Sequence, residues 1–186
     1  MKLLIIGAGY VGLVSGVCFS DFGHHVVCVD KDQSKIHQLN QGQIPIFEPG
    51  LADLLQKNVD AGRLSFTTKL SLAMIDADAI FIAVGTPSRR GDGAADLTYV
   101  KNAAIEAASI AKKNTLFITK STVPVGTNRE LKQIIANAYP SLEFDIASNP
   151  EFLREGSAIE DFQKPDRIIV GVESEKAKKI ISEIYR

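Results

Sequence analysis

The sequence predicts an α/β protein whose 186 residues form one domain, built on a doubly wound, mostly parallel sheet with helices on both faces. Two observations predict this class. Short apolar runs alternate along the chain with longer amphipathic stretches, which is the pattern of repeated β-α-β units. The short runs are also apolar throughout, which is typical of parallel strands buried on both faces.

In the first half of the chain we expect strands at residues 3–6, 26–29, 64–67 and 79–84, because β-branched, aromatic and other apolar residues dominate them. Residues 11–22 are predicted to be a helix with small residues on one side. Residues 32–40 place Ile36 and Leu39 at helical spacing, and residues 51–59 form a third helix after a loop that holds Pro45 and Pro49.

In the second half, the polar, glycine-rich residues 88–96 are expected to form an exposed, mobile loop. Helices are predicted at residues 97–111 and 128–139, the latter ending before Pro140. Strands are predicted at residues 116–119, 144–147 and 168–170. A charged amphipathic helix at residues 173–185 follows the last of them.

Composition narrows the classes of function. The formal net charge of -1 gives no overall field that would attract nucleic acid or an anionic membrane. No apolar run is long enough to span a bilayer and no signal peptide is visible, so we expect a cytoplasmic protein. Cys18 and Cys28 lie in apolar surroundings and are expected to be buried, reduced thiols. The scattered histidines show no metal-ligand spacing, so no metal site is expected.

A glycine pattern follows the first predicted strand. Gly7, Gly9 and Gly12 enclose Tyr10 and Val11 in the order G-x-G-x-x-G, between a strand and a helix. In the Rossmann fold, the first glycine permits a tight turn, the second admits a pyrophosphate, and the third lets the helix pack closely on the strand. The sequence therefore predicts a Rossmann-type domain that holds a dinucleotide over this loop.

An acidic residue specifies the dinucleotide. Asp30 ends the second predicted strand, at the spacing where a carboxylate meets the adenosine ribose. A carboxylate there accepts hydrogen bonds from the ribose hydroxyls and repels a 2′-phosphate, which predicts NAD rather than NADP. Lys31 and Lys35 lie nearby in the sequence, so some tolerance of a 2′-phosphate is conceivable.

Three further loops follow strands and belong to the same edge of the sheet, where doubly wound proteins bind ligands. These loops are residues 85–87, 121–127 and 149–156. Glycine, proline, serine and threonine are also ordinary turn residues, so one such loop would carry no weight. Three at successive strand ends favour a ligand cleft.

These loops carry long motifs: G-A-G-Y-V-G-L, V-G-T-P, S-T-V-P-V-G-T and N-P-E-F-L-R-E-G-S-A. Together they resemble the N-terminal domain of the UDP-glucose/GDP-mannose dehydrogenase family, over nearly the whole chain. The run at residues 159–171 is most similar to members that act on UDP-glucose. The resemblance implies NAD-dependent oxidation of the sugar C6 alcohol of UDP-glucose to the carboxylate of UDP-glucuronate, in two hydride transfers through a cysteine thiohemiacetal and thioester.

The resemblance also implies roles for residues. It matches NAD contacts to Val11, Asp30, Lys35, Thr86, Thr122 and Glu155. It matches the border of the substrate to Glu151, Phe152, Leu153, Arg154 and Glu155. Thr122 and Glu151 match residues that hold a catalytic water, and a hydroxyl and a carboxylate could orient that water and take its proton. By its position after Asn149 and Pro150, Glu151 could also be a carboxylate at a helix N-terminus.

The family's chemistry also needs a nucleophilic cysteine, which in the family lies beyond the stretch represented here. Cys18 is expected in a helix and Cys28 in a strand, so neither is a credible nucleophile. We therefore expect an N-terminal NAD-binding fragment, inactive alone, of a homodimeric enzyme that also has a central helix and a UDP-binding domain. Two alternatives remain: a dehydrogenase of GDP-mannose or of a UDP-N-acetylhexosamine, and a non-catalytic NAD-binding module.

Overall fold

The computed structural model describes residues 1–73, 77–91 and 93–186. A single sheet of seven strands runs through it in the order β3-β2-β1-β4-β5-β6-β7. Its strands are β1 (Lys2–Ile6), β2 (His25–Val29), β3 (Leu64–Thr67), β4 (Ala79–Ile82), β5 (Thr115–Thr119), β6 (Phe144–Ser148) and β7 (Gly171–Val172). Strands β1 to β6 pair in parallel, and β7 pairs with β6 in the antiparallel direction. The predicted Rossmann-type, mostly parallel architecture is confirmed.

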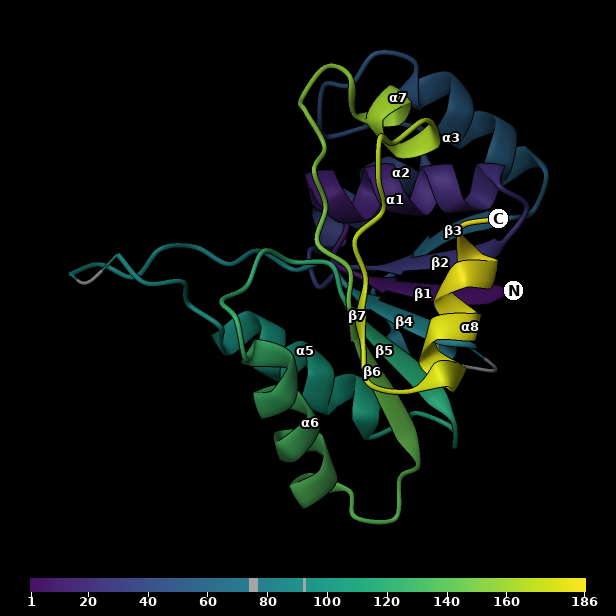
Figure 1. The fold of residues 1–186 in the computed structure, drawn as a ribbon. Coiled ribbons are helices and arrows are strands. Elements are labelled where there is room, and N and C mark those ends of the chain that lie inside the picture. The colour runs from purple at the N-terminus through teal and green to yellow at the C-terminus, as the bar shows by residue number, and fades with distance from the viewer. Residues whose placement is uncertain (74–76, 92) are drawn as a thin grey trace.

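Helices cover both faces of the sheet (Figure 1). One face holds α1 (Tyr10–Asp21), α2 (Gln33–Asn40), α3 (Leu51–Asp60), α7 (Ala158–Gln163) and α8 (Glu175–Ile184), whose buried side chains form one apolar core with the strands. The other holds α4 (Leu70–Ala73), α5 (Thr98–Ala108) and α6 (Thr127–Ala138), which form a second core. All residues of β4 and β5 are buried, as their unbroken apolar sequences predict.

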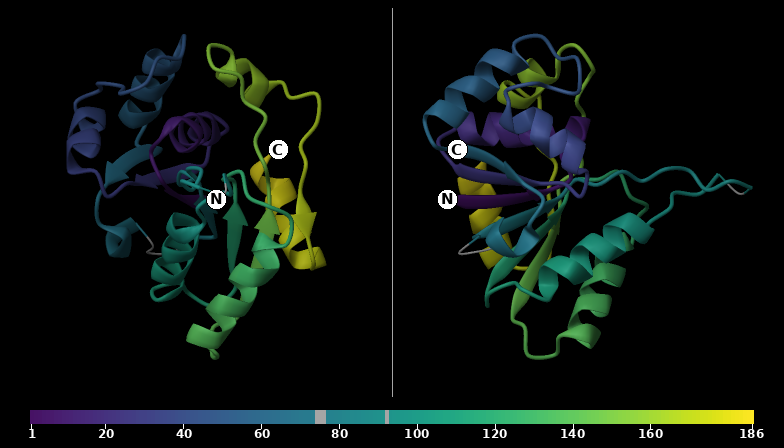
Figure 2. Two further views of the ribbon diagram at one scale, coloured as in Figure 1. Left: turned by 90° about the vertical axis from the view of Figure 1, so that its left-hand side faces the viewer. Right: turned by 180° about the vertical axis from the view of Figure 1, so that it is seen from behind.

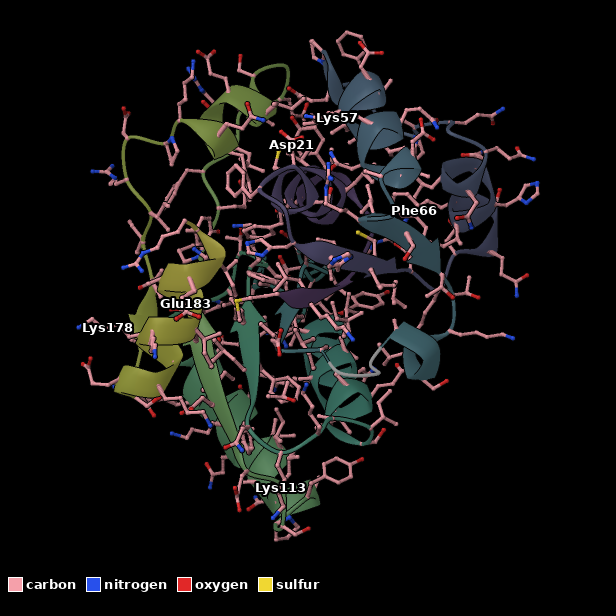
Figure 3. The ribbon with its side chains drawn as sticks, turned by 90° about the vertical axis from the view of Figure 1, so that its right-hand side faces the viewer. Asp21, Lys57, Phe66, Lys113, Lys178 and Glu183 are labelled. Atoms are coloured by element: carbon pink, nitrogen blue, oxygen red, sulfur yellow. The ribbon has the colours of Figure 1, made fainter. Side chains whose placement is uncertain are left out.

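The helices of the first face are also joined at their solvent side. Figure 3 shows Lys57 of α3 beside Asp21 at the end of α1, where the ammonium lies 2.7 Å from the carboxylate. Such an exposed ion pair contributes little to stability, so the helices are held mainly by their apolar faces.

Residues 86–91 and 93–97 leave the body of the molecule as the two arms of a projecting hairpin (Figure 2). An antiparallel bridge joins Ser88 to Ala95, and the Arg89 amide donates to the Ala94 carbonyl at 2.8 Å. The expected exposure of this segment is confirmed, although Asp92 lies outside the described residues. Its mobility stays a prediction.

The predicted strand at residues 168–170 is wrong. Pairing begins only at β7, where Gly171 faces Ser148 and Val172 faces Ala147. Ile168 and Ile169 are each 43% exposed. The Ile169 carbonyl accepts the side-chain amide of Asn149 at 3.0 Å instead of a ladder hydrogen bond, so this apolar run crosses the end of β6 without pairing with it. The short helices α4 and α7 were also not predicted.

The two ends of the described chain meet at the amino edge of the sheet. His24 is buried, and its Nδ1 lies 3.2 Å from the Met1 amine. Its Nε2 lies 2.8 Å from the carbonyl oxygen of Ile184, in α8. Burial lowers the pKa of His24, against the raising effect of the Ile184 carbonyl. A neutral imidazole therefore links the N-terminus to the last helix.

Candidate functional site

A cleft of about 510 Å³ lies over the glycine loop, at the carboxyl ends of β1, β2 and β4. Its apolar walls include Ile6, Val29 and Val84, and its rim carries Asp30 and Lys35. In the sheet, β1 lies between β2 and β4. The helix after β1 lies on one face and the helix after β4 on the other, so the chain leaves these two neighbouring strands in opposite directions above the cleft. This is the position at which doubly wound sheets bind nucleotides.

The glycines of the loop fit a dinucleotide for three different reasons. Gly7 has φ of +102°, which favours glycine, and a Cβ there would also press on the carbonyl of Ala83. A Cβ at Gly12 would overlap the carbonyl oxygen of Gly7, so only glycine lets α1 begin this close to β1. A Cβ at Gly9 would meet nothing within 4 Å, so this backbone opens into the cleft.

The beginning of α1 suits an anion. Its first turn holds no acidic residue, and among the described residues no side chain caps it. The first N–H groups of a helix have no partner within it and carry a partial positive charge. The loop thus offers donors and room for a pyrophosphate, and the residues present fit NAD.

Asp30 stands at the rim of the cleft as predicted. Its Oδ2 accepts hydrogen bonds from the Ala8 amide at 2.9 Å and the Lys35 ammonium at 2.8 Å, while Oδ1 accepts from the Asp32 amide at 3.0 Å. Burial acts to raise the pKa of Asp30, but these hydrogen bonds, led by that of Lys35, lower it overall. The carboxylate is therefore charged and fixed on the glycine loop.

The two lysines near the rim are paired with carboxylates. Lys35 is bound to Asp30, and the ammonium of Lys31 lies 2.7 Å from Glu106 of α5. The carboxylates of Asp30 and Glu106 thus offset the positive charge of the two lysines, which a 2′-phosphate would need for its binding. The structure thus gives little support to the tolerance of NADP that the sequence left conceivable.

The loops after β4 and β5 are joined to each other. The Thr86 hydroxyl donates to the Thr122 carbonyl at 3.0 Å, and the Ser121 hydroxyl donates to the Val84 carbonyl at 2.7 Å. Thr122 is exposed at this edge. Two of the loops expected to form the site therefore lie side by side, next to the cleft that Val84 and Pro87 line.

The segment after β6 is not helical, so the interpretation of Glu151 as a helix N-terminal carboxylate is wrong. The next helix, α7, begins only at Ala158. Glu151 instead accepts a hydrogen bond from the Leu153 amide at 2.6 Å, which fixes its carboxylate within the loop.

The other residues matched to the substrate border have different surroundings. Phe152 is 60% exposed, and Glu155 is exposed as well. The Arg154 guanidinium is paired with Asp161 of α7, with Nη2 2.6 Å from the carboxylate. Arg154 is therefore held against α7, with its charge offset.

The remaining predicted residues of the glycine loop, Tyr10, Val11 and Gly12, do not line the cleft. The Tyr10 hydroxyl donates to Glu48 at 2.5 Å, and Val11, the second residue of α1, packs against the core. Gly7, Gly9, Asp30 and Lys35 line the cleft, whereas Thr86, Thr122 and Glu155 do not.

Sequence reasoning missed Lys120, which is 3% exposed at the end of β5. Its ammonium donates to Asn149 Oδ1 at 3.2 Å and lies 3.1 Å from the Tyr185 hydroxyl. Burial lowers the pKa of Lys120 to about 8, although Glu151 acts to raise it. Lys120 lines a small cavity of about 60 Å³ together with Glu151 and Leu153. A lysine directly after a wholly buried strand was the available sequence indication.

Sequence reasoning also missed Glu48, which is 7% exposed in the loop between α2 and α3. Besides Tyr10, it accepts the amides of Gly156 and Ala158, each at 2.8 Å. These partners lie 38 to 110 residues away along the chain, so no local pattern could have identified Glu48.

Other kinds of site find no support. Within the described ranges no group of three or more histidine, cysteine or acidic side chains is placed to hold a metal ion. Among the helices that the structure describes, none has the length and apolarity needed to cross a membrane. Cys18 and Cys28 are free and buried, as expected.

Comparison with known proteins finds dehydrogenases that act on nucleotide sugars. A "UDP-glucose 6-dehydrogenase" from Rhizobium meliloti (strain 1021) is 59% identical over 188 residues, which cover 100% of this chain and 43% of the relative. A solved UDP-glucose dehydrogenase from Pyrobaculum islandicum superposes with a TM-score of 0.93 at 43% identity, covering 98% of this chain and 43% of that one. The chain thus spans less than half the length of these relatives.

A solved GDP-mannose dehydrogenase from Pseudomonas aeruginosa, determined as a ternary complex, superposes equally well. Its TM-score is 0.95 at 38% identity, and the match covers 100% of this chain and 44% of that one. The model of the NAD-binding domain of the UDP-glucose/GDP-mannose dehydrogenase family matches residues 1–186. With this match and the Rossmann cleft described above, the chain belongs to the UDP-glucose/GDP-mannose dehydrogenase family and is its NAD-binding domain.

Proposed function

We propose that this chain supplies the cofactor-binding wall of a UDP-glucose 6-dehydrogenase, an enzyme that oxidises UDP-glucose to UDP-glucuronate. The observation that carries the proposal is that the cleft over the glycine loop shares one sheet edge with Thr122 and with residues 151–155. Asp30 and the glycine loop would hold the dinucleotide at that edge. The substrate assignment rests on the similarity to UDP-glucose 6-dehydrogenases.

The residues of this chain would act by binding and orientation. NAD, when bound, accepts the hydride that leaves the sugar C6. The free N–H groups of α1 and the carboxylate of Asp30 would bind and orient the dinucleotide. Glu151, held by the Leu153 amide, and the Thr122 hydroxyl would orient a water and take its proton when the enzyme-bound acyl group is hydrolysed.

We further propose that the nucleophilic cysteine, a central dimerising helix and a UDP-binding domain belong to a longer form of the protein. The two cysteines of this chain support this division of labour, since both are buried in the core on the α1 side of the sheet. A longer form would then act as a homodimer, with this chain as one wall of each active site.

The cofactor assignment is tested by calorimetric titration of the chain with NAD and NADP. We expect NAD to bind more tightly, because Asp30 accepts ribose hydroxyls and repels a 2′-phosphate. The substitution Asp30→Ala removes a charged acceptor and should weaken NAD binding about tenfold or more while narrowing the preference over NADP. Asp53→Ala removes an exposed charge from α3 and serves as the control. Tighter binding of NADP by the unaltered chain would overturn the role given to Asp30.

The substrate assignment is tested with a longer form that includes the downstream domains. A panel of UDP-glucose, GDP-mannose and UDP-N-acetylhexosamines would be compared by kcat/KM for NADH formation. We expect UDP-glucose to be preferred. Preference for GDP-mannose, which the equally close superposition on a GDP-mannose dehydrogenase leaves open, would contradict the substrate while leaving the NAD site in place.

A further inference from the structure

We infer that Glu48 is a positioning residue that holds the 154–158 segment against the glycine loop, with Tyr10 as the link between them. The inference builds on the proposed function, because it connects the loop given to NAD with a segment whose first residues, Arg154 and Glu155, end the stretch given to the substrate. The connection runs through one buried carboxylate from a third part of the chain.

The two oxygens of the Glu48 carboxylate bind both the glycine loop and the 154–158 segment. Its Oε2 accepts the Tyr10 hydroxyl at 2.5 Å and the Gly156 amide at 2.8 Å. Its Oε1 accepts the Ala158 amide, also at 2.8 Å, at the first residue of α7. The Tyr10 hydroxyl additionally lies 3.4 Å from the Arg154 carbonyl, which gives it a second contact with the same segment.

The charge state of this group suits a fixed link. A buried carboxylate is costly unless donors satisfy it, and here a phenol and backbone amides surround it. Burial acts to raise the pKa of Glu48, but the hydrogen bonds from Tyr10, Gly156, Ala158 and Ile159 lower it overall. Burial and the neighbouring Glu48 raise the pKa of Tyr10, so the phenol keeps its proton and remains a donor.

The location of Tyr10 connects this link to the binding of the dinucleotide. Tyr10 is the first residue of α1, between Gly9 and Val11, where the helix N-terminus faces the cleft. Glu155, matched to a cofactor contact, immediately precedes Gly156. A dinucleotide that immobilises the glycine loop would therefore also immobilise the segment that borders the substrate, through two short hydrogen bonds and a rigid aromatic ring.

Amide hydrogen exchange of the 15N-labelled chain tests both halves of the inference. In Glu48→Gln, one amide oxygen replaces two carboxylate oxygens, so either Gly156 or Ala158 must lose its acceptor. We expect exchange at one or both of these amides to rise about tenfold or more, while the core amides of Ile5 and Phe81 keep their protection. Glu160→Gln removes an exposed carboxylate of α7 and should change none of them.

Tyr10→Phe tests the link itself, and it also keeps the question answerable if Glu48→Gln does not fold. The Gly156 and Ala158 amides keep their acceptor in this variant, so their exchange without NAD should hardly change. In the unaltered chain, saturating NAD should slow exchange at both amides, and this effect should be lost in Tyr10→Phe although NAD still binds. A purely structural role for Tyr10 would leave the NAD-linked effect intact.

The outcomes separate the inference from the proposed function. If NAD binds but leaves Gly156 and Ala158 unaffected, or if Tyr10→Phe retains the NAD-linked effect, the link is refuted and the cofactor assignment stands. If NAD does not bind, the cofactor assignment and the link both fail. The Glu48→Gln measurement without NAD still decides whether Glu48 holds the segment, and unchanged exchange there would refute that part.

Discussion

Lys120 is a cation enclosed by the fold, and its hydrogen-bond partners among the described residues are neutral. Asn149 and Tyr185 accept its hydrogen bonds, and its ammonium lies 5.4 Å from the ring centre of Phe162 and 5.9 Å from that of Tyr185. Neutral oxygens and aromatic faces stabilise a cation less than a paired anion would. The low pKa of Lys120, about 8, follows from this environment.

The stability of the protein should therefore depend on Lys120 above neutral pH. The ordinary pKa of lysine is about 10.4, so between roughly pH 8 and 10 the unfolded chain binds more protons than the folded one. Stability contributed by this group consequently rises with pH in that range. Thermal unfolding of the unaltered chain and of Lys120→Met should show the Tm difference, unaltered minus variant, increasing from pH 7 to about pH 9.5. Parallel profiles would contradict the low pKa of Lys120.

At the scale of single residues, the sequence predicts those residues whose role depends on neighbours close to them in the sequence. Asp30 was identified because its distance from the glycine loop is fixed by one β-α-β unit. Glu48 and Lys120 were missed because their partners come from other units of the fold, up to 110 residues away for Glu48 and 65 for Lys120. Glu151 was assigned two local environments, and the loop geometry excluded one of them.

At the junction of β1 and α1, one glycine is needed for packing and another for ligand binding. A Cβ at Gly12 would overlap the backbone oxygen of Gly7, an atom that cannot move without breaking the turn. A Cβ at Gly9 would project into open space within the cleft. The same chemical change therefore has different consequences three residues apart.

Gly12→Ala should destabilise the fold by about 1–3 kcal/mol, the usual range for forced overpacking. Gly9→Ala should alter the free energy of unfolding by less than about 0.5 kcal/mol but weaken NAD binding, because its methyl group occupies space meant for the pyrophosphate. Urea denaturation and calorimetric titration of both variants make the comparison. Equal losses of stability would contradict the assignment of the two glycines.

Whole elements were predicted where burial and periodicity act together. The expected strands that became β1 to β6 correspond to runs buried in the sheet, and each long helix was found near its predicted position. The elements that were not predicted correctly were two short helices and one apolar segment that pairs with no strand. The apolar residues 168–170 were mistaken for a strand because composition does not distinguish pairing from packing across a strand end. The four residues of α4 and six of α7 are too few to show a helical period.

At the scale of the molecule, the strand order is what turns separate motifs into a site. The glycine loop and the loops after β4, β5 and β6 lie far apart in sequence but follow adjacent parallel strands. The rule that such sheets bind ligands at their carboxyl edge was sufficient to predict this grouping. It did not predict which side chains face the cleft and which, like Tyr10 and Arg154, turn to partners elsewhere.

The molecule as a whole should bind NAD without oxidising UDP-glucose. Burial raises the pKa of both Cys18 and Cys28 to about 12, so neither provides a thiolate at neutral pH. We expect no NADH from the chain with NAD and UDP-glucose, and no reaction of its thiols with Ellman's reagent until denaturant is added. An active UDP-glucose dehydrogenase added to the same mixture is the positive control. Sustained NADH formation by the chain alone would show that the nucleophile need not lie outside it.

The hydrogen bonds of His24 bring the first residue and the last helix of this chain to one edge of the sheet, where both ends of the ribbon lie (Figure 1). The cleft lies at the opposite edge, beyond the carboxyl ends of β1, β2 and β4. A linker added to either terminus would thus leave the molecule on the side away from the glycine loop. The domain can be tethered to a sensor surface, or fused to a fluorescent reporter, by whichever end is convenient, and the dinucleotide entrance will still face the solution.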